Sequence, residues 1–205
     1  SKNCAGTETV SSDYTFTTTT DTTAPVITNV AFRDVTSNSA RITWTTDDLS
    51  TSQVDYGLTT SYGSSTTLDA NLVTDHSVNL TGLLSSQLYH FRVRSRNAVG
   101  LEGVSGDFVF TTAVDTTPPV ITNLQVASVT SNSATITWTT DDPSTGQVQY
   151  GMTSAYGQSK DEGPNLVTSH SVTITGLAPS TIYHYKVKST NNAALTSYSG
   201  DGTLM

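Results

Sequence analysis

The chain has little cysteine, few charged side chains and no long hydrophobic run. Its 205 residues include one cysteine, Cys4, which excludes an internal disulfide framework and a Cys-x-x-Cys metal site. No apolar run approaches the roughly 18 residues of a membrane-spanning helix, so no membrane span is predicted. The formal net charge of −8 argues against nucleic acid or an anionic membrane as a partner.

The composition that remains favours β-structure without catalysis. Charged residues make up only 13% of the chain, and threonine and serine supply most of the polarity. Threonine is β-branched and suits a pleated, half-solvated surface better than a helix. The sequence contains no Gly-x-Ser-x-Gly, His-Glu-x-x-His or P-loop motif, which are the patterns that common catalytic sites leave. We therefore expect an all-β protein that is not an enzyme and needs no cofactor.

A long internal repeat divides the chain. The run from Ser37 to Gly57 returns almost verbatim from Ser131 to Gly151, an offset of 94 residues, and no insertion or deletion interrupts the match. A period of roughly 90 to 100 residues corresponds to one immunoglobulin-sized sandwich rather than to a solenoid unit. Short proline-containing linkers precede each copy. The sequence thus predicts two tandem seven-stranded β-sandwiches, at residues 21–112 and 113–205, preceded by an orphan β-strand within residues 1–20.

Alternating apolar residues support this division. Ala40, Ile42 and Trp44 alternate with polar neighbours, as expected of a strand with one buried face. The same alternation is found at Val54 and Tyr56, and at Tyr89, Phe91 and Val93. The second copy repeats each of these patterns, and no helical period is present.

Several motifs resemble those of a known superfamily. The buried-strand tryptophan, together with Leu177-Ala-Pro-Ser-Thr-Ile-Tyr183, resembles the fibronectin type III fold and its tyrosine corner; the first copy has Leu84-Ser-Ser-Gln before Tyr89, a less standard corner. The runs Ile-Thr-Trp-Thr-Thr-Asp and Gln-Val-x-Tyr-Gly are similar to the fibronectin-like domain at the N-terminus of purple acid phosphatases. In that family the phosphatase chemistry resides in a separate metal-binding domain, whose motifs do not occur here. The resemblance implies a spacer module of an extracellular or cell-surface protein.

The two ends of the repeat differ from its middle. Asp13-Tyr-Thr-Phe-Thr-Thr18 matches the last strand of the first copy, whereas the second copy has Gly202 where that strand has Phe108. An unpaired strand must find a sheet edge. We therefore predict that residues 11–18 pair with the C-terminal domain of a neighbouring subunit, which gives a head-to-tail filament; the alternative is that residues 1–18 are the loose end of a longer array. The residues of this predicted assembly site are Tyr14, Phe16, Gly202 and Leu204.

Two groups of side chains are candidates for metal binding. Paired aspartates occupy the corner of each copy and could ligate calcium, although we favour the interpretation that they cap turns. His76 and His170 recur in phase with buried residues, but without the three or four convergent ligands that a metal site requires, so we favour hydrogen-bonded histidines. The calcium candidates are Asp47, Asp48, Asp141 and Asp142.

The remaining candidates concern surface recognition. Tyr62, Tyr156 and Tyr198 could form a platform for a surface glycan, against the alternative of half-buried packing, which we favour. Asn79 lies in a glycosylation sequon, and Cys4 is either a free thiol or an intermolecular bridge. The function predicted first is a spacer, stalk or filament protomer that associates with itself or with neighbouring repeats. The alternative is an adhesive or carbohydrate-binding accessory region of a secreted hydrolase.

Overall fold

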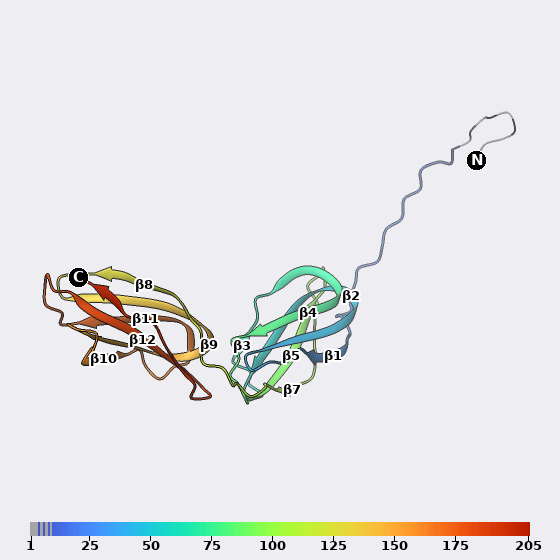
Figure 1. Cartoon of the computed structure of the whole chain (residues 1–205). Coiled ribbons are helices and arrows are strands. Elements are labelled where there is room, and N and C mark those ends of the chain that lie inside the picture. Colours follow the sequence, from blue (N-terminus) through green and yellow to red (C-terminus); the bar gives the residue numbers. More distant parts are fainter. Residues whose placement is uncertain (1–3, 5, 7, 9) are drawn as a thin grey trace.

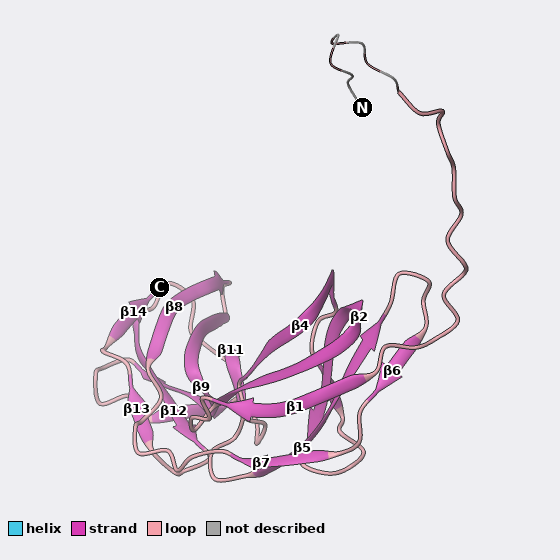
Figure 2. Ribbon diagram, turned by 90° about the vertical axis from the view of Figure 1, so that its right-hand side faces the viewer, coloured by secondary structure: helices cyan, strands magenta, loops and turns pink. Residues whose placement is uncertain are grey.

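The computed structural model describes Cys4, Gly6, Glu8 and residues 10–205. Two β-sandwiches lie end to end, and the N-terminal segment leaves the first on the side away from the second (Figure 1). All regular structure in the described part of the chain is strand (Figure 2). These residues accordingly include no helix long and apolar enough to cross a membrane. The predicted all-β, two-domain fold is confirmed.

Domain 1, formed by β1 to β7, is built on one long bent strand. The first part of β2 pairs with β1 and β4, whereas its second part pairs with β3 and β5, so the strand belongs to both sheets of the sandwich. β6 and β7 each pair with a different part of β5, and all pairings are antiparallel. The strands are β1 (Ile27–Arg33), β2 (Ser39–Gly57), β3 (Ser64–Ser65), β4 (Asp69–Thr81), β5 (Leu88–Arg96), β6 (Glu102–Val104) and β7 (Phe108–Thr111).

Domain 2 repeats this arrangement with β8 to β14. Its long strand β9 pairs with β8 and β11 on one side of the bend and with β10 and β12 on the other, and β13 and β14 add to β12. In both domains the sequence suggested two strands joined by a corner, whereas the structure has one continuous strand that bends there. The strands are β8 (Ile121–Val129), β9 (Ser133–Gly151), β10 (Gln158–Asp161), β11 (Val167–Thr175), β12 (Tyr183–Asn191), β13 (Thr196–Tyr198) and β14 (Gly202–Leu204).

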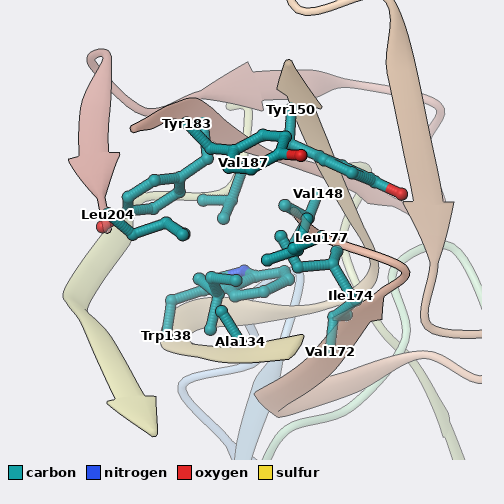
Figure 3. Close-up of a cluster of buried hydrophobic side chains, with 12 residues drawn as sticks. Ala134, Trp138, Val148, Tyr150, Val172, Ile174, Leu177, Tyr183, Val187 and Leu204 are labelled. Carbon is teal, nitrogen blue, oxygen red and sulfur yellow. The ribbon is translucent and has the colours of Figure 1, made fainter. Parts of the chain in front are cut away.

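Each domain has its own hydrophobic core between its two sheets. In domain 2, Trp138 lies beneath the side chains that face inward from β9, β11 and β12, and Leu204 closes one end (Figure 3). Fully burying an aliphatic or aromatic side chain of this kind contributes about 1.5 to 3 kcal/mol. The core of domain 1 consists of Ala40, Ile42, Trp44, Val54, Leu80, Leu83, Tyr89, Phe91, Val93 and Phe110.

Both domains form the tyrosine corner. The hydroxyl oxygen of Tyr89 accepts a hydrogen bond from the Leu84 amide at 2.9 Å, and that of Tyr183 accepts one from the Ala178 amide at 3.1 Å. The less standard sequence of domain 1 makes the same bond because the donor is a backbone N–H, which any residue except proline supplies.

The last strand of domain 2 is formed, although Gly202 stands where the first copy has Phe108. Tyr185 pairs with Gly202 and Tyr183 pairs with Leu204, whose side chain is buried. A Cβ at Gly202 would lie 2.7 Å from the Tyr185 ring, so the tyrosine occupies the space that Phe108 fills in domain 1. The glycine is therefore complementary to Tyr185, and the pairing of β14 with β12 uses the strand edge that an exchanged strand would need.

Residues 11–20 form no strand in this single chain. Tyr14 and Phe16 are 81% and 90% exposed and contact neither sandwich core. Each domain forms its own last strand, β7 or β14, at the position that residues 11–18 match in the repeat. The remainder of the predicted N-terminal strand segment, residues 1–10, lies partly outside the described residues.

Candidate functional site

The corner aspartates hold the entry of each domain to its long strand. Asp47 Oδ1 accepts a hydrogen bond from the Val26 amide at 2.7 Å, and Asp141 Oδ1 accepts one from the Val120 amide at 2.6 Å. No group of three or more His, Cys, Asp or Glu side chains suited to a metal ion occurs among the described residues. Asp47 and Asp141 thus bind backbone amides 21 residues earlier in the chain, rather than capping their own turns as the sequence favoured.

The linker aspartates tie each linker to the domain that follows it. Asp21 Oδ2 accepts a hydrogen bond from Asn97 Nδ2 at 2.6 Å, and hydrogen bonds from Thr23 lower the pKa of Asp21. Asp115 Oδ2 accepts the equivalent bond from Asn191 Nδ2, also at 2.6 Å. Each of these carboxylates accepts hydrogen bonds both from its own linker and from the domain that follows, and so fixes the direction in which the chain enters its sandwich.

Asp142 has a different role, because it joins the two domains. Its Oδ1 atom accepts a hydrogen bond of 2.6 Å from Nδ2 of Asn38, which lies in the turn between β1 and β2 of domain 1. The same Asn38 nitrogen lies 3.5 Å from the Asp141 carbonyl oxygen. Asp142 is only 6% exposed. Of the four calcium candidates, it alone accepts a hydrogen bond from the other domain through its side chain.

A second contact crosses the junction beside the first. The Ser85 hydroxyl donates to Asn192 Oδ1 at 3.0 Å, and Asn192 Nδ2 donates to the Ser85 carbonyl at 2.9 Å. The linker itself is held to domain 1, since the Ala113 amide donates to the Thr36 carbonyl at 3.0 Å. Two side-chain contacts and a hydrogen-bonded linker therefore dock domain 2 on domain 1.

Burial changes the ionisation of the junction carboxylate. Desolvation raises the pKa of Asp142, and the nearby carboxylates of Asp115 and Asp141 add to the rise, whereas the hydrogen bond from Asn38 opposes it. The neutral form of Asp142 is therefore favoured up to a higher pH than that of an exposed carboxyl group. The stability that Asp142 contributes at the junction should therefore fall as the pH rises from the acidic range.

The two buried histidines belong to the cores. The ring of His76 stacks on Trp44 with centroids 4.7 Å apart, and the ring of His170 stacks on Trp138 at 4.8 Å. The Nε2 atom of His76 lies 2.9 Å from the Thr46 hydroxyl, and burial lowers the pKa of His76. Both histidines have hydrogen-bond partners within the protein, as the sequence favoured.

The Nδ1 atoms of the two histidines are bound by different residues. In domain 1, Nδ1 of His76 lies 2.8 Å from the Ser52 hydroxyl. In domain 2 that serine is replaced by Gly146. There Nδ1 of His170 lies 2.7 Å from the carboxylate of Glu162, which directly follows β10. The serine-to-glycine exchange creates the room in which Glu162 lies.

The three tyrosines proposed as a sugar platform interact with cations of the protein. The guanidinium of Arg92 lies 4.8 Å from the Tyr62 ring centroid. The Lys186 ammonium lies 4.8 Å from the Tyr156 ring and 4.9 Å from the Tyr198 ring, so one cation bridges both aromatics. Tyr198 is 54% exposed, whereas Tyr62 and Tyr156 are half-buried.

Two surface candidates remain from the sequence, and both are exposed to solvent. Asn79 is exposed on β4 with its side chain toward solvent, and Cys4 is exposed and forms no disulfide. The asparagines and the serine of the junction were missed by sequence analysis, which singled out carboxylates, histidines and aromatics. A break in the repeat would have singled out two of them, since Asn192 corresponds to Ala98 and Ser85 to Pro179, whereas Asn38 is repeated as Asn132 and gives no such signal.

Comparison with curated proteins finds similarity to parts of larger enzymes. The chain is 33% identical over 166 residues to Endoglucanase B of Cellulomonas fimi and 31% identical over 183 residues to Chitinase A1 of Niallia circulans. These matches cover 78% and 84% of this chain but only 16% and 24% of the respective relatives. The chain thus spans a minor part of the length of the enzymes that it matches.

The chain is also similar to solved structures, and it matches a family model over most of its length. The FN1–FN3 domains of chicken CNTN1 match 88% of this chain and are themselves covered to 65%, with 20% identity and a TM-score of 0.37. The family model of the purple acid phosphatase N-terminal domain matches residues 25–112 and, a second time, residues 119–201. Both sandwiches are therefore matched almost in full, and the chain belongs to the family of the purple acid phosphatase N-terminal domain, with two copies in tandem.

Proposed function

We propose that this chain is a non-catalytic extracellular spacer that holds the parts it connects at a fixed separation. The observation that carries the proposal is the docked junction, in which Asn38 bonds Asp142 and Ser85 bonds Asn192 across the domain boundary. Relative motion is the default expectation for two domains of one chain whose interface is not large and hydrophobic. A junction with directional hydrogen bonds and a bound linker favours one relative orientation.

Two further observations support a non-catalytic role and an extracellular location, respectively. The space between the sheets is filled by hydrophobic side chains, and the two buried histidines, His76 and His170, already have partners. An active site requires a reactive group that is accessible in a cleft. The relatives named as a glucanase and a chitinase support an extracellular location, because the polymers in their names are too large to enter a cell.

The spacer proposal is tested by measuring interdomain order in solution. Residual dipolar couplings of the two domains should fit a single alignment tensor for the whole chain, and small-angle scattering should give one elongated shape that does not change with ionic strength. Independent tensors for the two domains would contradict the proposal. Polysaccharide and phosphate-ester hydrolysis assays on the same sample should show no turnover above buffer.

One observation favours a second function, an adhesive or carbohydrate-binding accessory region. Tyr198 lines a shallow groove together with Pro118 and Leu124, and an exposed aromatic side chain can stack on a sugar ring. A glycan array with the native chain, Tyr198→Ala and Tyr62→Ala tests it. If the native chain binds a glycan and only Tyr198→Ala abolishes the binding, a glycan site at Tyr198 is established. If neither the native chain nor the variants bind any glycan, the spacer role stands without it.

A head-to-tail assembly is the finer form of the spacer proposal. Exchange of residues 11–18 into domain 2 now has a competitor in β14, which occupies the edge of β12. Deleting residues 1–18 tests it: loss of fibres with both domains still folded would support strand exchange, and fibres that persist would exclude it. A head-to-tail assembly without strand exchange would instead join the outer end of domain 1 to the outer end of domain 2 in another copy.

A further inference from the structure

We propose that the outer end of domain 1 is a docking socket for the outer end of domain 2 in a second copy of this chain. The proposal rests on the spacer function above and extends it to a head-to-tail partner. The socket is the hollow lined by Asp21, Asp47, Asp48, Leu49 and Asn97. The plug is the turn at residues 130–133, which carries Asn132.

The filled form of this socket is present within the chain. At the junction, the turn at residues 36–39 of domain 1 inserts Asn38 against the corner of domain 2, where Asp142 accepts its hydrogen bond. Asp142 and Asp48 occupy the same position of the repeat, 94 residues apart. The junction therefore demonstrates which chemistry this corner receives: a side-chain amide presented by a tight turn.

The plug at the free end of domain 2 has the same geometry as the docked turn. In the docked turn, the Thr36 hydroxyl lies 2.7 Å from the Ser39 hydroxyl and donates to Asn38 Oδ1 at 3.2 Å. In the free turn, the Thr130 hydroxyl lies 2.7 Å from the Ser133 hydroxyl and donates to Asn132 Oδ1 at 3.3 Å. The amide group of Asn132 is thus held in the orientation that Asn38 uses, and it is exposed.

The socket at the outer end of domain 1 is built, and no described residue fills it. The Asp48 carboxylate has no hydrogen bond to any described residue, although its counterpart Asp142 is bonded and buried. Leu49 is 59% exposed, whereas Pro143 at the same position of domain 2 is buried. Docking of a turn on this face would cover the leucine and give Asp48 its partner.

The second polar contact of the junction is absent from the proposed one. Ala98 stands where domain 2 has Asn192, and Pro179 stands where domain 1 has Ser85. Association through the remaining contact should be weak, with a Kd in roughly the millimolar range, as for small transient interfaces. Because plug and socket lie at opposite ends of the chain, the contact is heterologous and propagates without closing.

The experiment follows amide shifts of the labelled native chain by NMR from micromolar to low-millimolar concentration. Shifts that grow with concentration should be confined to residues around Asp48 and Leu49 and to residues 130–133. Asp48→Ala and Asn132→Ala should each abolish them, whereas Asp75→Ala and Asn79→Ala, which remove an exposed carboxylate and an exposed amide elsewhere, should not. Absence of such shifts in the native chain, or shifts at other surfaces, would overturn the proposal.

A mixing arm separates docking from a general effect of the substitutions. Labelled Asp48→Ala retains the plug and unlabelled Asn132→Ala retains the socket, so the mixture should shift residues 130–133 although neither variant associates alone. The double substitution Ala98→Asn with Pro179→Ser should restore the second contact and lower the Kd several-fold; an unchanged or higher Kd would count against the proposal. Dipolar couplings from the same samples report the internal junction, so failure of the spacer function is recognised separately.

Discussion

The Glu162 carboxylate lies 2.7 Å from Nδ1 of the buried His170, and its other oxygen accepts the Ser171 amide at 2.8 Å. The repeat makes this relationship informative. Domain 1 has Leu68 in place of Glu162 and Ser52 in place of Gly146, and there the serine hydroxyl binds the histidine. The two domains therefore satisfy the same buried nitrogen with two different pairs of residues.

We expect the two positions to be coupled. Glu162→Leu leaves His170 Nδ1 buried without a partner and should lower the free energy of unfolding of domain 2 by about 1 to 3 kcal/mol. Gly146→Ser should also destabilise, because a Cβ there would overlap the Glu162 carboxylate and lie within 2.9 Å of the Trp138 and His170 rings. The double variant reproduces the residues of domain 1 and should recover most of the loss. Urea unfolding followed through NMR signals of domain 2 measures this, and additive losses would contradict the coupling.

The contact between Asn38 and Asp142 should determine the orientation of the domains. Asn38→Ala removes one hydrogen bond at a part-buried site, which costs about 1 kcal/mol of docking free energy. The domains should then align independently in residual dipolar couplings while each keeps its own unfolding midpoint. Asn132→Ala, in the equivalent free turn, is the matched control and should leave the alignment within one chain unchanged.

The raised pKa of Asp142 predicts how docking depends on pH. The folded state holds this proton more tightly than the unfolded chain, so the stability it contributes is complete below the unfolded value near 3.8 and is lost as pH rises through the raised folded value. Asp142→Asn keeps an acceptor for Asn38 but cannot ionise. It should stabilise domain 2 at neutral pH and have little effect at pH values below the unfolded pKa, as measured by thermal unfolding. An equal effect at both pH values would contradict this assignment.

Domain 1 should be the more acid-sensitive domain. Hydrogen bonds from Arg94 and Arg96 lower the pKa of Glu102 from 4.5 to about 2. The stability from Glu102 is present above pH 4.5 and is lost as the pH falls toward 2. Since these side chains are close to solvent and screened, the loss should be about 1 kcal/mol or less.

The measurement is urea unfolding of each domain across this acidic range. Glu102→Gln should flatten the acid dependence of domain 1. Domain 2 has Thr196 at the equivalent position and pairs it with the Thr190 hydroxyl at 2.9 Å, so it is the internal control. An equally steep loss in both domains would assign the acid sensitivity to other groups.

The repeat and the alternation of apolar residues were sufficient to predict the architecture. An offset of 94 residues without gaps indicated two equal domains. The inward phase of residues such as Trp44 and Tyr89, in a chain with no helical period, favoured sandwiches, because two packed sheets bury one face of each alternating strand. The preference for hydrogen-bonded histidines followed from ligand counting, and the structure gives His76 and His170 such partners. The corner aspartates were expected to cap their own turns, whereas Asp47 and Asp141 bind amides 21 residues away.

What the sequence alone determined is therefore the content of each domain, since strands, cores and corners depend on local pattern and on neighbours within one repeat. Only the tertiary structure decided how the exceptions are used. Gly202 proved to accommodate Tyr185, and Asp142 proved to join two domains, because both outcomes depend on side chains that are distant in sequence. A pattern of residue types along the chain does not encode which atoms meet across a sheet or a junction, and those meetings distinguish two otherwise repeated domains.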